Sequence, residues 1–160
     1  MKKMTRAITI CFLLFVVIFF TVKAQVPKPV KWSFNVEQNG DEATLLLKAT
    51  IDKTWHLYSQ DIPDGGPIPT NFKFTPTDDY ELEGKVTEPE AKIFHDPNFE
   101  MDLKFFEKEV VFRQMIKLKT TQAFSVKGTL EFMACDDKMC LPPNEIPFNF
   151  QIKANGEKGN

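Results

Sequence analysis

The feature that most constrains the fold is a two-residue alternation of apolar and polar side chains in short segments. The ranges Trp32–Val36 and Phe148–Ile152 show it at the two ends of the chain. Such alternation places the apolar side chains on one face of a β-strand. Turn-forming residues, such as the pair Asn39-Gly40, separate the segments at spacings of roughly 8–12 residues. No window shows a sustained 3.6-residue apolar period between helix caps, so the sequence predicts an all-β sandwich or barrel.

The expected strands follow one another along the chain, each bounded by a turn or a loop. They cover residues 32–36, 43–51, 55–60, 72–74, 80–86, 103–119, 124–134 and 146–152. Residues 61–70 contain several prolines and glycines and are expected to form a loop. Residues 91–96 lead into a turn at Pro97-Asn98.

The first 24 residues have the layout of a secretory signal peptide. Basic residues precede an apolar run at 8–20, and Val22 and Ala24 fit the −3 and −1 positions of a cleavage site. The run is shorter than the ~20 residues of a membrane span, and an uncleaved N-terminal anchor is the alternative. We therefore expect an exported chain that begins at Gln25 and forms one domain, 25–160, with a frayed tail at 154–160.

The charge of the exported chain narrows the classes of partner. Removal of residues 1–24 takes away four basic residues and no acidic ones, which changes the formal net charge from −2 to −6. An acidic domain does not favour nucleic acid or an anionic membrane as a partner. The sequence contains no serine-hydrolase elbow, phosphate-binding loop or dinucleotide fingerprint. Export also places the remaining cysteines where disulfides persist.

Cys135 and Cys140 are the two cysteines left after residues 1–24 are removed. The alternation in 124–134 places Cys135 at the end of a strand, on the face opposite the apolar side chains. Pro142-Pro143 delays the next strand, so the cysteines are expected at the mouth of a β-hairpin with 136–139 as an exposed tip. A disulfide is feasible, because facing Cβ atoms lie about 4.5–5.5 Å apart and a disulfide needs about 3.5–4.5 Å.

Two interpretations of this cysteine pair remain open. A bond across so short a loop stabilises the fold by roughly 2 kcal/mol in the chain-entropy model, so a bond at an exposed tip is easier to explain as redox chemistry. The alternative is a structural clip in a secreted binding module. A zinc site has little support, because two sulfurs without a nearby histidine leave a tetrahedral site half empty.

The charges around the two cysteines predict which one attacks. Asp136 and Asp137 follow Cys135 directly and disfavour its thiolate, whereas Cys140 lies farther from them and close to Lys138. Cys140 is therefore expected to form the intermolecular bond, and Cys135 to resolve it.

Phe99 and the two histidines need separate interpretations. Phe99 sits in a polar turn and must cover something, either a functional site or the core onto which its loop folds back. His56 and His95 lie far apart in the sequence and form no metal pattern, so each is expected to be a surface or packing residue.

Three segments together resemble the N-terminal periplasmic domain of the thiol:disulfide interchange protein DsbD, over about residues 32–152. The first is Cys135 with the run Cys140-Leu-Pro-Pro143, which matches the family's close cysteine pair followed by two prolines. The second is Trp55-His-Leu-Tyr58, which is similar to an aromatic Tyr-x-Tyr segment near the cysteines. The third is Phe94-His-Asp-Pro-Asn-Phe99, which resembles a cap loop whose phenylalanine shields the active-site disulfide.

The resemblance implies an immunoglobulin-like antiparallel β-sandwich in the periplasm. It implies thiol–disulfide exchange, in which a thioredoxin-like or DsbD-type membrane redox protein supplies electrons that pass to periplasmic disulfide proteins. The oxidoreductase would need no small-molecule cofactor beyond its cysteines. Cys135 and Cys140 would be the catalytic residues, with Phe99 as the cap and with Tyr58 and His56 lining the site.

The sequence differs from the family pattern at several places. Four residues separate the cysteines instead of five, Pro97 and Asn98 replace acidic residues before the cap phenylalanine, and His56 replaces the first tyrosine. The sequence ends at Asn160, without the family's transmembrane and C-terminal thioredoxin-like domains. We therefore expect a stand-alone version that either draws its electrons from a separate protein or no longer shuttles electrons.

Overall fold

The computed structural model describes residues 26–154. The predicted signal peptide and residues 155–160 of the predicted frayed tail lie outside the described residues. Within 26–154 the chain forms eleven β-strands and no helix. The strands are β1 (Val30–Asn39), β2 (Glu42–Ile51), β3 (His56–Tyr58), β4 (Asn71–Phe74), β5 (Tyr80–Thr87), β6 (Lys92–Asp96), β7 (Met101–Phe106), β8 (Glu109–Leu118), β9 (Phe124–Phe132), β10 (Ala134–Cys135) and β11 (Asn144–Ile152).

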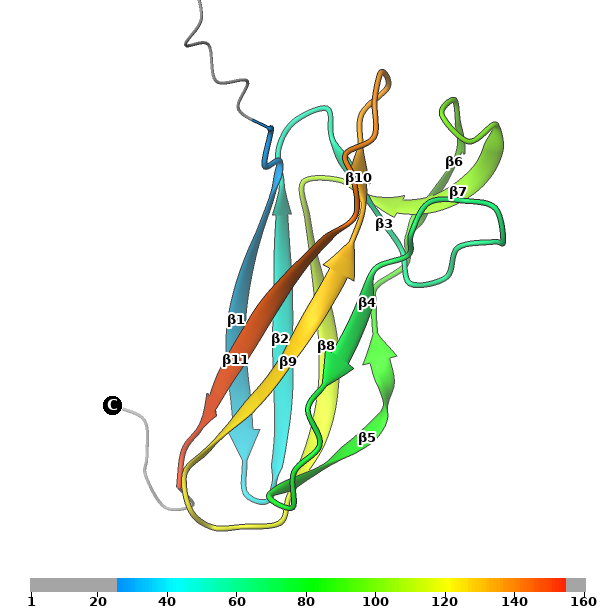
Figure 1. Cartoon of the computed structure of the whole chain (residues 1–160). Helices are drawn as coiled ribbons and strands as arrows, with labels where there is room; N and C mark the ends of the chain where they lie inside the picture. The colour runs from blue at the N-terminus through cyan, green and yellow to red at the C-terminus, as the bar shows by residue number, and fades with distance from the viewer. Residues whose placement is uncertain (1–25, 155–160) are drawn as a thin grey trace, which may run out of the picture.

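Two antiparallel sheets make up the body of the molecule. One has the strand order β1-β2-β8-β5 and the other the order β11-β9-β4. Figure 1 shows them as two layers, and the rings of Phe34 on β1 and of Phe148 and Phe150 on β11 meet between them, 5.7–5.9 Å apart. The predicted all-β antiparallel sandwich is therefore confirmed.

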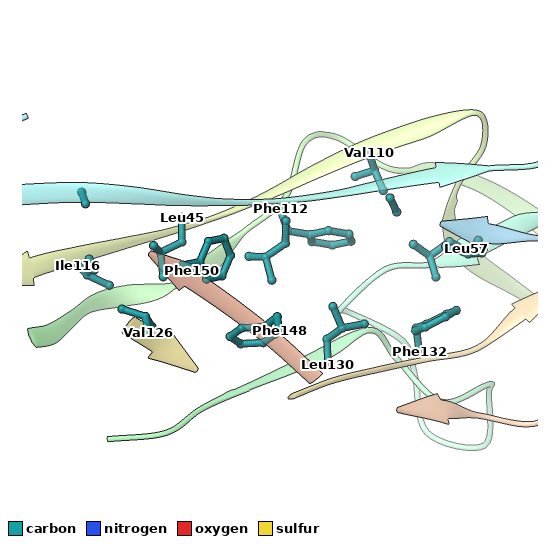
Figure 2. Close-up of a cluster of buried hydrophobic side chains, with 14 of the residues drawn as sticks. Leu45, Leu57, Val110, Phe112, Ile116, Val126, Leu130, Phe132, Phe148 and Phe150 are labelled. Carbon is teal, nitrogen blue, oxygen red and sulfur yellow. The ribbon is translucent and has the colours of Figure 1, made fainter. Parts of the chain in front are cut away.

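The main core lies between these two sheets and follows from the alternation in the sequence. Every second residue of β2 from Ala43 to Ile51 is buried, as is every second residue of β8 from Val110 to Leu118. Figure 2 shows Leu45 and Phe112 of one sheet with Leu130, Phe148 and Phe150 of the other. Each fully buried Leu or Phe side chain contributes about 1.5–3 kcal/mol to stability, so this core supplies most of the driving force for folding.

A smaller third sheet, with the order β10-β3-β7-β6, lies at one end of the sandwich (Figure 1). Three of its strands continue strands of the sandwich: β3 follows β2, β7 precedes β8, and β10 follows β9. The chain changes direction where Thr54 and Lys108 adopt left-handed backbone conformations, with φ of 75° and 64°. The packed sandwich therefore fixes where the third sheet begins.

Several of the expected strand boundaries are wrong. The first strand is Val30–Asn39 and not 32–36, and residues 92–96, expected only to lead into a turn, form β6. The run 103–119 is not one strand, because the chain turns at Lys108, whose carbonyl accepts a hydrogen bond from the amide of Ile51 at 2.7 Å. The strand expected at 55–60 is limited to β3, although it does bury bulky side chains on both faces. The last strand begins at Asn144 rather than at Ile146.

Candidate functional site

Cys135 and Cys140 form a disulfide at the end of the hairpin built by β9, β10 and β11, with their Cα atoms 4.1 Å apart. The Asp136 amide donates to the Met139 carbonyl at 2.9 Å and closes the tip. The Asp136 side chain accepts hydrogen bonds from the amides of Lys138 and Met139, both at 2.8 Å. The predicted hairpin mouth and tip are thus confirmed, and the tip is a well-bonded turn.

The expectation that both cysteines lie at an exposed tip is wrong for Cys135, which is 0% exposed. Cys140 is only partly buried. Ala134 belongs to the main core, so Cys135 points to the opposite face, as predicted. There it joins a second apolar cluster, called the site cluster below. The site cluster consists of Tyr58, Leu103, Phe105 and Cys135, with Ile62, Phe94, Phe99, Met101, Met133 and Cys140 packed against it.

Phe99 packs against the site cluster and not against the main core. Its ring meets the ring of Tyr58 edge to face, with centroids 6.1 Å apart. Phe99 lies in the turn Asp96–Glu100 between β6 and β7, called the cap loop below. Of the two alternatives for Phe99, the structure shows that the loop folds back onto the cluster that holds the disulfide.

Hydrogen bonds to Asp96 and Asp136 fix the conformation of the cap loop. The carboxylate of Asp96 accepts from the amide of Asn98, and the carbonyl of Asp96 accepts from the amide of Glu100, both at 2.8 Å. The side-chain amide of Asn98 donates to the carbonyl of Asp136 at 3.1 Å. The cap loop is therefore bonded directly to the tip of the cysteine hairpin.

A buried polar network ties β3 to the cap loop. The hydroxyl of Tyr58 donates to the carboxylate of Asp96 at 2.5 Å, and Nε2 of His56 lies 3.2 Å from that hydroxyl and 3.4 Å from the carboxylate. The exposed fractions of Tyr58 and Asp96 are 0% and that of His56 is 5%. Because unpaired buried polar groups are costly, these three side chains stabilise one another's positions.

Burial and hydrogen bonding shift the pKa values of this network. Burial lowers the pKa of His56, although the nearby Asp96 carboxylate opposes the shift. Burial, reinforced by the hydrogen bond to Asp96, raises the pKa of Tyr58. For Asp96 burial acts against ionisation, but the hydrogen bonds from Tyr58 and Asn98 and the proximity of His56 outweigh it and hold the pKa below its usual value. At neutral pH the network thus contains an ionised Asp96 and a neutral His56.

The structure brings the predicted site residues Cys135, Cys140, Phe99, Tyr58 and His56 together around the site cluster. His95 is exposed, away from this cluster, and its ring lies 3.1 Å from the carboxylate of Asp102. Within residues 26–154 there is no group of three or more His, Cys, Asp and Glu side chains that could hold a metal ion.

Sequence reasoning missed the roles of Asp96 and Asn98. Asp96 shares a strand face with Phe94, two residues before it, and a carboxylate on an apolar face is the signal that could have indicated a buried hydrogen-bonded acid. The contact of Asn98 with the cysteine hairpin joins residues 38 positions apart, and no local sequence pattern encodes it.

The fold and site define a class: an antiparallel β-sandwich with a disulfide at the end of one hairpin and an aromatic loop packed against the apolar cluster that holds this disulfide. The sequence matches the family described as thiol:disulfide interchange protein DsbD, N-terminal, over residues 23–151. The chain belongs to this family, so the resemblance inferred from the cysteine, Trp55–Tyr58 and Phe94–Phe99 segments is confirmed.

Solved structures share the same fold at low sequence identity. The DsbD N-terminal domain of Neisseria meningitidis in the reduced form is 18% identical with a TM-score of 0.56, covering 82% of this chain and 91% of that one. The N-terminal periplasmic domain of ScsB from Proteus mirabilis is 15% identical with a TM-score of 0.61, covering 81% of this chain and 50% of that one. A complex of the DsbD and PilB N-terminal domains from N. meningitidis contains a match that is 14% identical with a TM-score of 0.55, covering 83% of this chain and 94% of that one. The predicted immunoglobulin-like sandwich is confirmed.

A search of curated protein sequences finds no significant match. Within residues 26–154 no helix has the length and apolar character needed to cross a bilayer.

Proposed function

We propose that this protein carries reducing equivalents in the periplasm by thiol–disulfide exchange at Cys135 and Cys140. The observation that carries the proposal is the asymmetry of the disulfide beneath the cap loop. Cys140 is partly exposed, whereas Cys135 is fully buried in the site cluster. A partner's thiolate can therefore approach Cys140 once Phe99 moves aside, whereas Cys135 is accessible only from within the chain.

The reaction begins when a donor thiolate attacks Sγ of Cys140. A mixed disulfide forms, the Cys135–Cys140 bond breaks, and Cys135 leaves as a thiolate that takes up a proton. The donor's second thiol then resolves the mixed disulfide, which leaves the donor oxidised and both cysteines reduced. In the second half-reaction Cys140 attacks the disulfide of an acceptor, and Cys135 closes the original bond again. Two electrons and two protons pass from donor to acceptor in each cycle.

The partners proposed are a thioredoxin-like or DsbD-type membrane redox protein as donor, and periplasmic disulfide proteins as acceptors. Membership of the DsbD N-terminal family supports this proposal, as does the complex that a related domain forms with the PilB N-terminal domain. Location in the periplasm is supported by the signal-peptide pattern of residues 1–24 and by the related ScsB domain, which is periplasmic.

One observation favours a second candidate function, a secreted binding module in which the disulfide is only a structural clip. Cys135 is buried like a core residue, and buried cysteines are generally inert. The reduction potential separates the two functions. A structural bond is expected below about −300 mV and a carrier well above that value, measured by equilibration with glutathione or dithiothreitol.

Trapping tests the roles of the two thiols. The Cys135→Ser variant is expected to accumulate a mixed disulfide through Cys140 with a thioredoxin-like partner, whereas Cys140→Ser is expected to trap none. Equal trapping by the two variants would show that the roles are assigned wrongly. No trapping by either, with a bond that resists physiological reductants, would refute the carrier function.

A further inference from the structure

His56 faces Cys135 across two paired strands. In the register of β3 and β10, His56 lies opposite Cys135, and Leu57 lies opposite Ala134. Leu57 and Ala134 point into the main core, so His56 and Cys135 point together to the other face. Side chains that face each other in this way have Cβ atoms about 4.5–5.5 Å apart, within reach of an imidazole ring.

The hydrogen bonds around His56 fix which ring nitrogen can accept a proton. The hydroxyl of Tyr58 donates its only hydrogen to the ionised Asp96, so its oxygen can accept from Nε2–H of His56 at 3.2 Å. In the neutral ring Nε2 then carries the hydrogen and Nδ1 carries the lone pair. Within residues 26–154 no protein group hydrogen-bonds to Nδ1 of His56, so Nδ1 is the ring nitrogen that can accept a proton.

Cys135 needs a nearby group that can accept and return a proton. It is fully buried, and burial makes its thiolate costly. Asp136 and Asp137, which follow it, disfavour the thiolate further. Each half-reaction of the proposed exchange nevertheless passes through this thiolate, so a proton must be delivered to or removed from Cys135 beneath the cap loop.

We propose that His56, held by Tyr58 and Asp96, is the proton donor and acceptor for Cys135. The proposal rests on the thiol–disulfide exchange proposed above and adds a catalytic group to it. When Cys135 resolves a mixed disulfide, Nδ1 of His56 takes the thiol proton, and the thiolate attacks Sγ of Cys140. The Cys135–Cys140 bond forms, the partner's thiolate leaves, and the imidazolium releases its proton. In the reverse direction the imidazolium protonates Cys135 as the disulfide breaks.

The charges around His56 suit both directions of transfer. Asp96 on β6 and Tyr58 on β3 contact the ring, and Asp136 and Asp137 after β10 and Glu107 after β7 add negative charge nearby. Burial keeps the ring neutral at pH 7, and these carboxylates stabilise the imidazolium whenever a proton arrives. The aromatic rings of Phe94 and Phe105, 5.6 and 5.3 Å from the imidazole, limit the access of water.

The test uses 5,5′-dithiobis(2-nitrobenzoate) and the reduced protein in stopped flow. Attack of one cysteine on the reagent releases one equivalent of thionitrobenzoate, and attack of the other on the mixed disulfide releases a second. Cys135→Ser is expected to release one equivalent at the rate of the wild-type first phase, which assigns the second phase to Cys135. His56→Gln is expected to slow the second phase by roughly 10–100-fold at pH 7 and to change the first by less than twofold. His95→Gln, which changes an exposed histidine beside a carboxylate, is the matched control.

The pH profile gives a readout that a structural role of His56 would not move. In the wild type the second phase is expected to rise through an inflection below pH ~6.5, which the first phase lacks. In His56→Gln this inflection is expected to disappear, leaving the ionisation of a thiol at about pH 8.5 or higher. If His56→Gln does not fold, the presence or absence of the wild-type inflection decides the question.

Each failure has its own signature. An unchanged second phase in His56→Gln, equal slowing in His95→Gln, or a wild-type second phase without the inflection would overturn the role of His56 and leave the carrier function intact. If Cys135→Ser releases no thionitrobenzoate, Cys140 is not the attacking thiol, and the thiol roles in the proposed function are wrong together with the role of His56 that rests on them.

Discussion

Replacement of Phe99 by alanine tests whether the cap loop shields the disulfide. A fully buried phenylalanine costs about 3–5 kcal/mol when truncated, but Phe99 is only partly buried and lies in a loop, so we expect a loss of about 1–2 kcal/mol. For a domain of this size that lowers Tm by about 3–10 °C. The edge-to-face contact with Tyr58 contributes about 0.5–1.5 kcal/mol to the closed position of the loop. Because 1.4 kcal/mol corresponds to a tenfold change in the equilibrium between the closed and open positions of the loop, reduction of the disulfide by dithiothreitol is expected to accelerate about 2–12-fold.

Phe72→Ala is the matched control for this experiment. Phe72 is also partly buried, but it belongs to β4 and packs against the main core, where its ring lies 5.0 Å from that of Phe112. We expect it to destabilise the fold at least as much as Phe99→Ala while changing the reduction rate less than twofold. If both variants accelerate reduction equally, the effect reflects general loosening. If Phe99→Ala lowers Tm by more than about 10 °C with an unchanged rate, Phe99 is a core residue and not a shield.

Three further predictions concern the core, acid stability and processing. Gly128→Ala should destabilise the sandwich by about 1–3 kcal/mol in urea unfolding, because the new Cβ would lie 2.2 Å from the carbonyl of Lys73, whereas Lys127→Ala should have little effect. Stability should fall as the pH drops below ~6.5, because the unfolded chain protonates His56 more readily than the folded chain does. It should fall again below ~4 as Asp96 loses its charge. His56→Gln should remove the first decrease. Intact mass of the exported protein should correspond to a chain that begins at Gln25, and a mass that retains residues 1–24 would favour the membrane anchor.

The two-residue alternation was sufficient to predict the sandwich and the faces of its strands. Ala134 and Cys135 show why this worked at the site, since adjacent residues of a strand must point to opposite faces. The same rule could not locate the break in 103–119, because Lys108 carries no sequence signal for a left-handed backbone. The burial of Cys135 was also missed, because strands β3 and β7, which surround it, are distant in sequence from the cysteine hairpin.

The position of the third sheet explains how one strand can serve both folding and chemistry. Leu57 and Ala134 are anchored in the main core, while their neighbours His56 and Cys135 face the site cluster. Packing of the sandwich therefore sets the distance between His56 and Cys135 without help from the disulfide. We expect cleavage of that bond to leave the pairing of β3 with β10 in place, because this pairing does not depend on the disulfide. We therefore expect His56 and Cys135 to stay in register in both the oxidised and the reduced protein, as the proposed proton transfer between them requires.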